Sequence, residues 1–207
     1  MELVADTLSK RFRRRVLFRE LSFRVEPGVP LAVTGANGSG KSTLIKILAG
    51  VLRPTKGHAH LSLNGTLLSA AERPLHTGLV APYFQVYDGL SPRENLAFIA
   101  KARRLADAES RIDDTLRHVQ LHRRSRDLVK TFSSGMKQRM RFAAALLAAP
   151  PLLLLDEPTS NLDAAGREMV HRFIVQQRDE GRLLVIATND PADTALCTAR
   201  IHVEDYR

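Results

Sequence analysis

One eight-residue stretch constrains the fold more than any other part of the chain. Residues 35–42 read GANGSGKS, which matches the pattern G-x-x-x-x-G-K-S/T. The apolar run LAVTG (31–35) precedes it, and the helical pattern STLIKILAGVL (42–52) follows it. A phosphate-binding loop requires this order of strand, glycine-rich turn and helix. We therefore expect an α/β fold in which this loop holds the phosphates of a nucleotide.

Each type of residue in the loop has a predicted role. Glycines allow backbone N–H groups to converge on phosphate oxygens, and the N-terminus of the following helix adds positive potential. Lys41 is expected to reach the β- and γ-phosphates, and Ser42 to supply an oxygen to Mg²⁺. The predicted nucleotide-binding residues of the loop are Gly35, Ala36, Asn37, Gly38, Ser39, Gly40, Lys41, Ser42 and Thr43.

Two acidic residues end the most apolar strand pattern. The run PLLLLDEP (151–158) has Asp156 and Glu157 directly after four leucines. Carboxylates at the end of a buried strand cost free energy unless a positive group meets them. Mg²⁺ beside the phosphate loop would meet Asp156. Glu157 is then expected to polarise the water that attacks the γ-phosphate.

A second buried strand pattern ends in a polar triplet. The run RLLVIATND (182–190) closes with Thr188, Asn189 and Asp190, and Pro191 opposes its continuation. In α/β sheets, ligands bind at the carboxyl ends of such strands. We therefore expect the triplet to lie at the same edge of the sheet as the phosphate loop.

The remaining patterns predict one domain with an insertion. The alternating run HLSLNGTLL (60–68) around its Asn-Gly pair is typical of a hairpin with a type I′ turn. The segment SPRE (91–94) predicts a helix start with a capping box. The chain is mainly helical in pattern from there to residue 149. We expect a single domain over 1–207, with a helical subdomain inserted at about 88–149.

Composition limits the partners and the cellular setting. The chain has 31 Lys and Arg against 22 Asp and Glu, a net charge of +9. The basic runs KRFRRR (10–15) and HRRSR (122–126) are either solvated faces or contact surfaces for an acidic partner. The single cysteine, Cys197, excludes an internal disulfide, and the seven histidines have no metal-binding spacing. The most apolar stretch, 142–155, is too short to span a bilayer.

The order of these motifs resembles the ATP-binding subunits of ABC transporters along nearly the whole chain. The segment TFSSGMKQR (131–139) resembles the signature motif of that family. The resemblance implies that Ser133, Ser134 and Gly135 face the γ-phosphate of ATP held by the opposite subunit, so that a homodimer sandwiches two nucleotides. The segment SNLD (160–163) resembles the D-loop, which implies that Asp163 reaches across the dimer.

Three further positions take their expected roles from the resemblance. The segment 81–95 resembles the glutamine loop, which implies that Gln85 approaches Mg²⁺ and water and that the following residues couple to a membrane partner. Phe12 matches the aromatic position that stacks on adenine. The alternative is that this lone aromatic residue in a basic stretch belongs to the core. Asn189 occupies the switch position, where the family usually has a histidine that contacts the γ-phosphate. An amide still donates a hydrogen bond but is shorter and uncharged, so we expect slow hydrolysis. The alternative is that Asn189 only begins the turn before Pro191.

The resemblance implies an ATPase that uses ATP and Mg²⁺ and drives separate integral membrane subunits from the cytoplasmic face of the inner membrane. Its compact size resembles the haem-exporter ATPases of cytochrome c maturation, with drug- or polysaccharide-export ATPases as the rival assignment. A non-transport ABC-type ATPase acting on nucleic acid or ribosomes is the alternative of another class. Such proteins usually carry a second nucleotide domain, coiled coils or zinc modules, so no nucleic-acid partner is expected. A non-hydrolysing clamp is a third alternative, and Glu157 argues against it.

Overall fold

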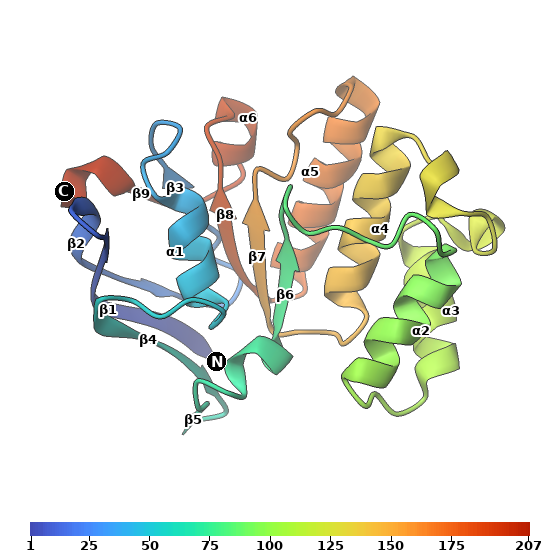
Figure 1. Ribbon diagram of the computed structural model, residues 1–207, viewed down its shortest axis with the longest axis horizontal. Helices are drawn as coiled ribbons and strands as arrows, with labels where there is room; N and C mark the ends of the chain where they lie inside the picture. The colour runs from blue at the N-terminus through green and yellow to red at the C-terminus, as the bar shows by residue number, and fades with distance from the viewer.

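The computed structural model describes residues 1–207, which form two sheets with helices around them (Figure 1). The larger sheet is all-parallel, with the strand order β6-β7-β8-β3-β9. Every residue of β3, β7 and β8 is buried, as expected for strands covered on both faces. The predicted α/β class and its buried strands are therefore confirmed. The five strands are β3 (Leu31–Thr34), β6 (Thr77–Val80), β7 (Leu152–Asp156), β8 (Leu183–Ala187) and β9 (Ala199–His202).

The smaller sheet is antiparallel and has the order β2-β1-β4-β5. Its last two strands pair Leu63 with Thr66, and the residues between them, Asn64 and Gly65, have φ angles of 50° and 78°. Two positive φ angles are what a type I′ turn requires, so the predicted hairpin is confirmed. The strands are β1 (Glu2–Phe12), β2 (Arg15–Val25), β4 (Lys56–Leu63) and β5 (Thr66–Leu67).

Helix α1 (Lys41–Leu48) packs in one apolar core with both sheets, and it is shorter than the sequence pattern predicts. The helical pattern runs to residue 52, but Gly50 adopts a φ angle of 79°. The N–H of Gly50 donates to the carbonyl of Ile47, and the N–H of Val51 donates to that of Lys46. These two bonds form a Schellman motif, which ends the helix by satisfying its last carbonyls.

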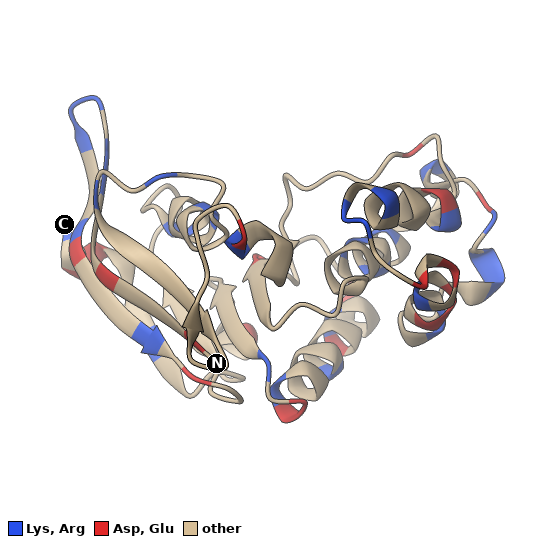
Figure 2. Ribbon diagram, turned by 90° about the horizontal axis from the view of Figure 1, so that it is seen from below, with Lys and Arg blue, Asp and Glu red and all other residues tan.

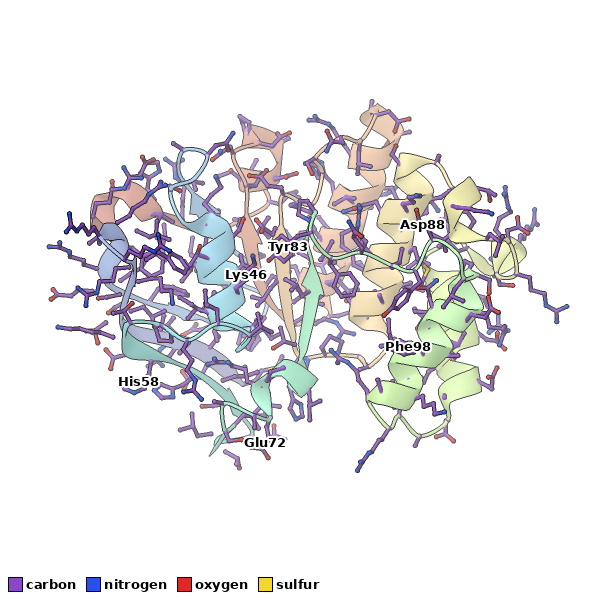
Figure 3. All side chains as sticks on the ribbon, viewed as in Figure 1. Lys46, His58, Glu72, Tyr83, Asp88 and Phe98 are labelled. Carbon is purple, nitrogen blue, oxygen red and sulfur yellow. The ribbon has the colours of Figure 1, made fainter.

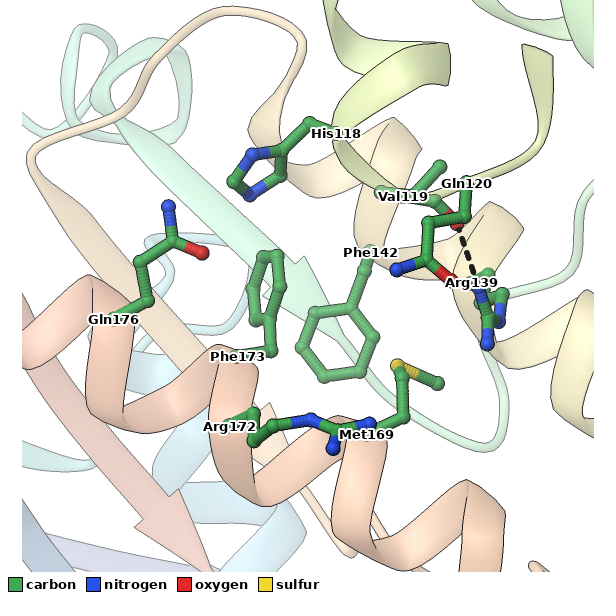
Figure 4. Close-up of a pocket in the computed structure, with 9 residues that line it drawn as sticks. All are labelled: His118, Val119, Gln120, Arg139, Phe142, Met169, Arg172, Phe173 and Gln176. Carbon is green, nitrogen blue, oxygen red and sulfur yellow. Dashed lines mark hydrogen bonds between the residues drawn. The ribbon is translucent and has the colours of Figure 1, made fainter.

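The chain between β6 and β7 is the helical insertion, and in Figure 1 it lies beyond the β6 edge of the parallel sheet. Its first helix begins with the predicted capping box: Ser91 accepts a hydrogen bond from the Glu94 N–H, and Glu94 accepts one from the Ser91 N–H. Its last helix packs on α5 (Ala164–Asp179). The rings of Phe142 and Phe173 lie 4.5 Å apart beside a small pocket (Figure 4). The helices of the insertion are α2 (Pro92–Ala102), α3 (Ala108–His118) and α4 (Ser134–Leu146).

Two short segments complete the carboxyl-terminal part. Helix α6 (Pro191–Thr194) follows β8, and a 3₁₀ helix (Val203–Tyr206) follows β9. None of the helices combines the length and the hydropathy that a membrane span requires.

Candidate functional site

The phosphate loop joins β3 to α1 and depends on glycine for its shape. Gly35, Gly38 and Gly40 have φ angles of 143°, 78° and 122°, a region that other residues rarely adopt. A Cβ atom on Gly35 would lie 2.8 Å from the Oγ of Ser39. The loop can therefore turn tightly enough for its backbone N–H groups to converge only with glycine at these positions.

Lys41 lies inside this loop. Its side chain is buried, and its ammonium donates to the carbonyl oxygen of Gly35 at 2.6 Å. The same ammonium lies 3.8 Å from Oε1 of Glu157. Because β7 lies two strands from β3, this ion pair joins the two motifs across the carboxyl edge of the sheet.

Asp156 is a buried carboxylate without a hydrogen-bond partner. Its residue is 1% exposed, and neither carboxylate oxygen accepts a hydrogen bond of good geometry. Burial raises the pKa of Asp156, while the hydroxyl of Ser42 and the ammonium groups of Lys41 and Lys46 lower it. Such a carboxylate is stable beside a bound cation. Oxygens are the ligands that Mg²⁺ prefers, so Asp156 and Ser42 fit that ion.

Glu157 stands between the buried strand and solvent. Its φ angle of 47° is rare outside glycine, and its N–H donates to the carbonyl of Ala187 on β8 at 2.8 Å. The side chain is 32% exposed. Burial raises the pKa of Glu157, and the charge of Lys41 opposes the shift. A partly desolvated carboxylate with access to water is suited to accept a proton from it.

Tyr83 is a residue of this site that the sequence reading missed. It lies just after β6, with the ammonium of Lys46 4.1 Å from its ring centroid, and Figure 3 shows the two side by side. Tyr83 is 43% exposed, but the partial burial of its hydroxyl raises the pKa of that group, and the carboxylate of Asp156 adds to the shift. Tyr83 therefore borders the pair of oxygens predicted to hold the cation. Only its position in the predicted glutamine loop could have pointed to it.

Asn189 contacts the phosphate loop directly. Its side-chain amide donates to the side-chain oxygen of Asn37 at 3.3 Å. The turn before α6 is held by its neighbour Asp190, whose carboxylate accepts from the N–H of Ala192 at 2.9 Å. Asn189 thus lies where the triplet was expected, and the capping function of that turn belongs to Asp190.

A buried network lies beneath the triplet, and no sequence pattern indicated it. Asp193 is fully buried and accepts hydrogen bonds from the hydroxyls of Thr159 at 2.8 Å and Thr188 at 3.0 Å. Its other carboxylate oxygen lies 2.7 Å from Nε2 of His171. Because Thr159 follows Glu157 and Thr188 precedes Asn189, Asp193 ties the two loops of the site together.

A family model described as "ABC transporter" matches residues 18–160, which include both the phosphate loop and the Asp156–Glu157 pair. The chain belongs to the ABC transporter family. It is an ABC-type ATPase domain, and ATP is the nucleotide that this family binds.

Several relatives are similar over most of this ABC ATPase domain. The cytochrome c biogenesis ATP-binding export protein CcmA of Rhodospirillum rubrum is 38% identical, over 84% of this chain and 74% of that protein. An uncharacterized ABC transporter ATP-binding protein of Bacillus subtilis, YybJ, is 30% identical over 97% and 91%. The linearmycin resistance ATP-binding protein LnrL of the same bacterium is 28% identical, and this chain spans 66% of its length.

Solved structures agree on the fold. An ATP-binding subunit of an ABC transporter has a TM-score of 0.83 at 28% identity, covering 98% of this chain and 85% of that one. A dimeric ATP-binding cassette described as bound to ADP and Pi has a TM-score of 0.82 at 22% identity, covering 97% and 93%. The predicted ABC ATPase core, with a small antiparallel sheet and a helical segment, is therefore confirmed.

The residues predicted to form the signature and the D-loop lie apart from the phosphate loop of the same chain. Ser133 caps α4 by accepting a hydrogen bond from the Met136 N–H, and Asp163 caps α5 by accepting one from the Gly166 N–H. Both line one pocket with Gly135, and no phosphate-loop residue lines it. Ser134 is the first residue of α4 and is exposed. This separation is what a site shared between two subunits would require.

Two predicted residues have few contacts. The side chain of Gln85 is exposed and makes no hydrogen bond. Phe12 ends β1 with 48% of its surface exposed, and the ammonium of Lys10 lies 4.8 Å from its ring centroid. The exposure of Phe12 excludes the alternative that it is a core residue, and its stacking role remains a prediction.

Proposed function

We propose that this chain is the ATP-hydrolysing subunit of an ABC transporter and drives a separate integral membrane subunit, with haem export for cytochrome c biogenesis as its specific task. We further propose that residues 1–207 act as one domain with a helical insertion at about 88–149. The observation that carries the proposal is the joint geometry of Lys41, Asp156 and Glu157 at one edge of the sheet.

The mechanism follows from these side chains. The N–H groups of the loop and Lys41 bind the phosphates, and Ser42 and Asp156, with Gln85, would hold Mg²⁺. When bound, this ion neutralises charge that develops on the phosphate oxygens. Glu157 orients a water molecule and accepts its proton as that water attacks the γ-phosphate. Asn189 donates a hydrogen bond to the same phosphate.

The dimer is part of the proposal. Ser133, Ser134 and Gly135 form the N-terminus of α4, where backbone N–H groups and the helix dipole favour an anion. In a homodimer closed by ATP, this N-terminus meets the γ-phosphate on the opposite subunit, and Asp163 reaches across the same interface. Hydrolysis then removes the group that both subunits hold, and the dimer opens.

An exposed pair of aromatic residues on this chain is available to contact the proposed membrane partner. Tyr87 lies in the predicted glutamine loop, Phe98 lies on α2, and their rings make an edge-to-face contact with centroids 5.5 Å apart. Both side chains are more than half exposed. Exposed aromatic residues are enriched at protein interfaces, so this pair is a contact for the membrane subunit at the cytoplasmic face of the inner membrane. Haem export is favoured over drug export by the 38% identity to CcmA.

The proposal is tested by phosphate release from MgATP over a range of protein concentrations. We expect the rate per subunit to rise with concentration, because the active unit is a dimer, and to vanish in Lys41→Ala. A rate per subunit that is independent of concentration would contradict the shared site.

The transported substrate needs a separate test. In the complex reconstituted with its membrane subunit, stimulation of hydrolysis by haem would support haem export, and stimulation by apolar drugs instead would contradict it.

The role of Asn189 gives a separate prediction. Asn189→His introduces a longer donor that can carry charge, so we expect turnover to rise about threefold or more with the affinity for MgATP unchanged. Asn189→Ala is the matched control and is expected to lower turnover, since it has no donor. Steady-state hydrolysis with a parallel binding titration measures both. Flat or reduced turnover in Asn189→His at unchanged affinity would contradict the weakened switch.

A further inference from the structure

The tip of the β1–β2 hairpin contacts the phosphate loop through Arg15. Its Nη2 atom donates a hydrogen bond to the carbonyl oxygen of Gly38, in the middle of the loop, at 2.7 Å. In the hairpin register, Arg15 lies directly opposite Phe12. Directly opposed residues of antiparallel strands lie on the same face. The guanidinium and the ring predicted to stack on adenine therefore share one face of the hairpin.

Arg15 differs from the other arginines of this tip. Figure 2 shows basic residues gathered there, but the side chains of Arg13 and Arg14 form no hydrogen bond and no ion pair. Arg15 also has no carboxylate partner, so its charge is not neutralised by the protein. A guanidinium carries five N–H donors in a planar fork that suits phosphate oxygens. Only one of these donors is used, on Gly38.

We propose that Arg15 is a phosphate-binding residue of the nucleotide site, in addition to the residues of the phosphate loop. The carbonyl of Gly38 aims the guanidinium, and its free donors bind a non-bridging phosphate oxygen of the nucleotide. This inference rests on the proposed function, since it requires the loop to bind ATP. At the hairpin tip, Arg15 is then a contact residue while Arg13 and Arg14 are solvated, which combines the two interpretations that the sequence of the basic run allows.

The test is isothermal titration of MgATP, MgADP and AMP into the wild-type chain, Arg15→Ala and Arg14→Ala. We expect Arg15→Ala to weaken MgATP binding about tenfold, the size of a lost charge-assisted contact. Arg14→Ala is the matched control from the same tip and should change affinity less than about twofold. The loss in Arg15→Ala should be smallest for AMP and should shrink at high salt, because screening weakens an exposed charge pair.

Other outcomes would overturn the inference. Equal losses in Arg14→Ala and Arg15→Ala would show that only the general positive potential of the tip matters. A loss in Arg15→Ala that is the same for all three nucleotides and insensitive to salt would show that Arg15 only shapes the loop. Arg15→Lys keeps the charge without the planar fork, so its affinity for MgATP should lie between that of the wild-type chain and that of Arg15→Ala. If the wild-type chain itself does not bind MgATP, the proposed function fails first and this contact fails with it.

Discussion

Glu157→Gln is expected to lower ATP hydrolysis about 100-fold or more, the contribution typical of a general base. The amide keeps the size of the side chain but cannot accept the proton of the attacking water. The ion pair with Lys41 is also lost, which leaves that ammonium to its loop carbonyls and to phosphate. Binding of MgATP should therefore be retained, and the ATP-bound dimer should accumulate because it cannot complete the reaction.

Phosphate release and size-exclusion chromatography with MgATP measure the two effects. Retained turnover in Glu157→Gln would exclude this glutamate as the base.

The pH profile of hydrolysis provides a second check on the role of Glu157. Glu157 must be ionised to act, and burial raises its pKa, so the acidic limb of kcat/KM should lie above the ordinary pKa of glutamate. Activity is expected to rise with pH through that limb.

Asp193→Ala is expected to lower the free energy of unfolding by about 3 kcal/mol. The carboxylate accepts from Thr159 and Thr188 and contacts His171, all within a buried region. Its removal leaves two buried hydroxyls without their acceptor. Urea unfolding of the nucleotide-free chain measures the loss. A change below about 1 kcal/mol would show that water or a local shift replaces the carboxylate.

A double-mutant cycle separates the two hydroxyl contacts. Thr159→Val and Thr188→Val keep the side-chain volume and should each cost about 1 kcal/mol. Combined with Asp193→Ala, each valine should add less than its single cost, because residues of one network are coupled. Strict additivity would contradict the network. Turnover in the same variants shows whether the link between the loops also supports catalysis.

The sequence predicts the parts of the fold and of the site that short contiguous patterns encode. The phosphate loop, the buried strand before Asp156 and the capping box at Ser91 each depend on residues close together in the chain. Tyr83 and Asp193 could not be found in this way. Tyr83, just after β6, contacts Lys46 of α1. Asp193 accepts hydrogen bonds from Thr159 and Thr188, which lie in two different loops. Their partners are set by the order of the strands, which the sequence pattern does not specify.

The same limit applies to the extent of α1 and to Arg15. The helical pattern continues past Leu48, and the positive φ angle of Gly50 with the two hydrogen bonds of the Schellman motif shows where the helix ends. Arg15 stands in a basic run whose members are alike in sequence. The hairpin register brings one of them to Gly38, and that register includes several bulges that no local pattern reveals.

The position of β3 in the sheet has a consequence for how the chain is made. Leu31 pairs with Val185 on β8 and with Ala199 on β9, so both neighbours of the strand that leads into the phosphate loop come from much later in the sequence. On the ribosome, this loop emerges well before the two strands that support it. A chain whose synthesis stops before β8 keeps β3 without partners and exposes its backbone to aggregation. We therefore expect ATP binding to require β8 and β9, which are synthesised long after the loop itself.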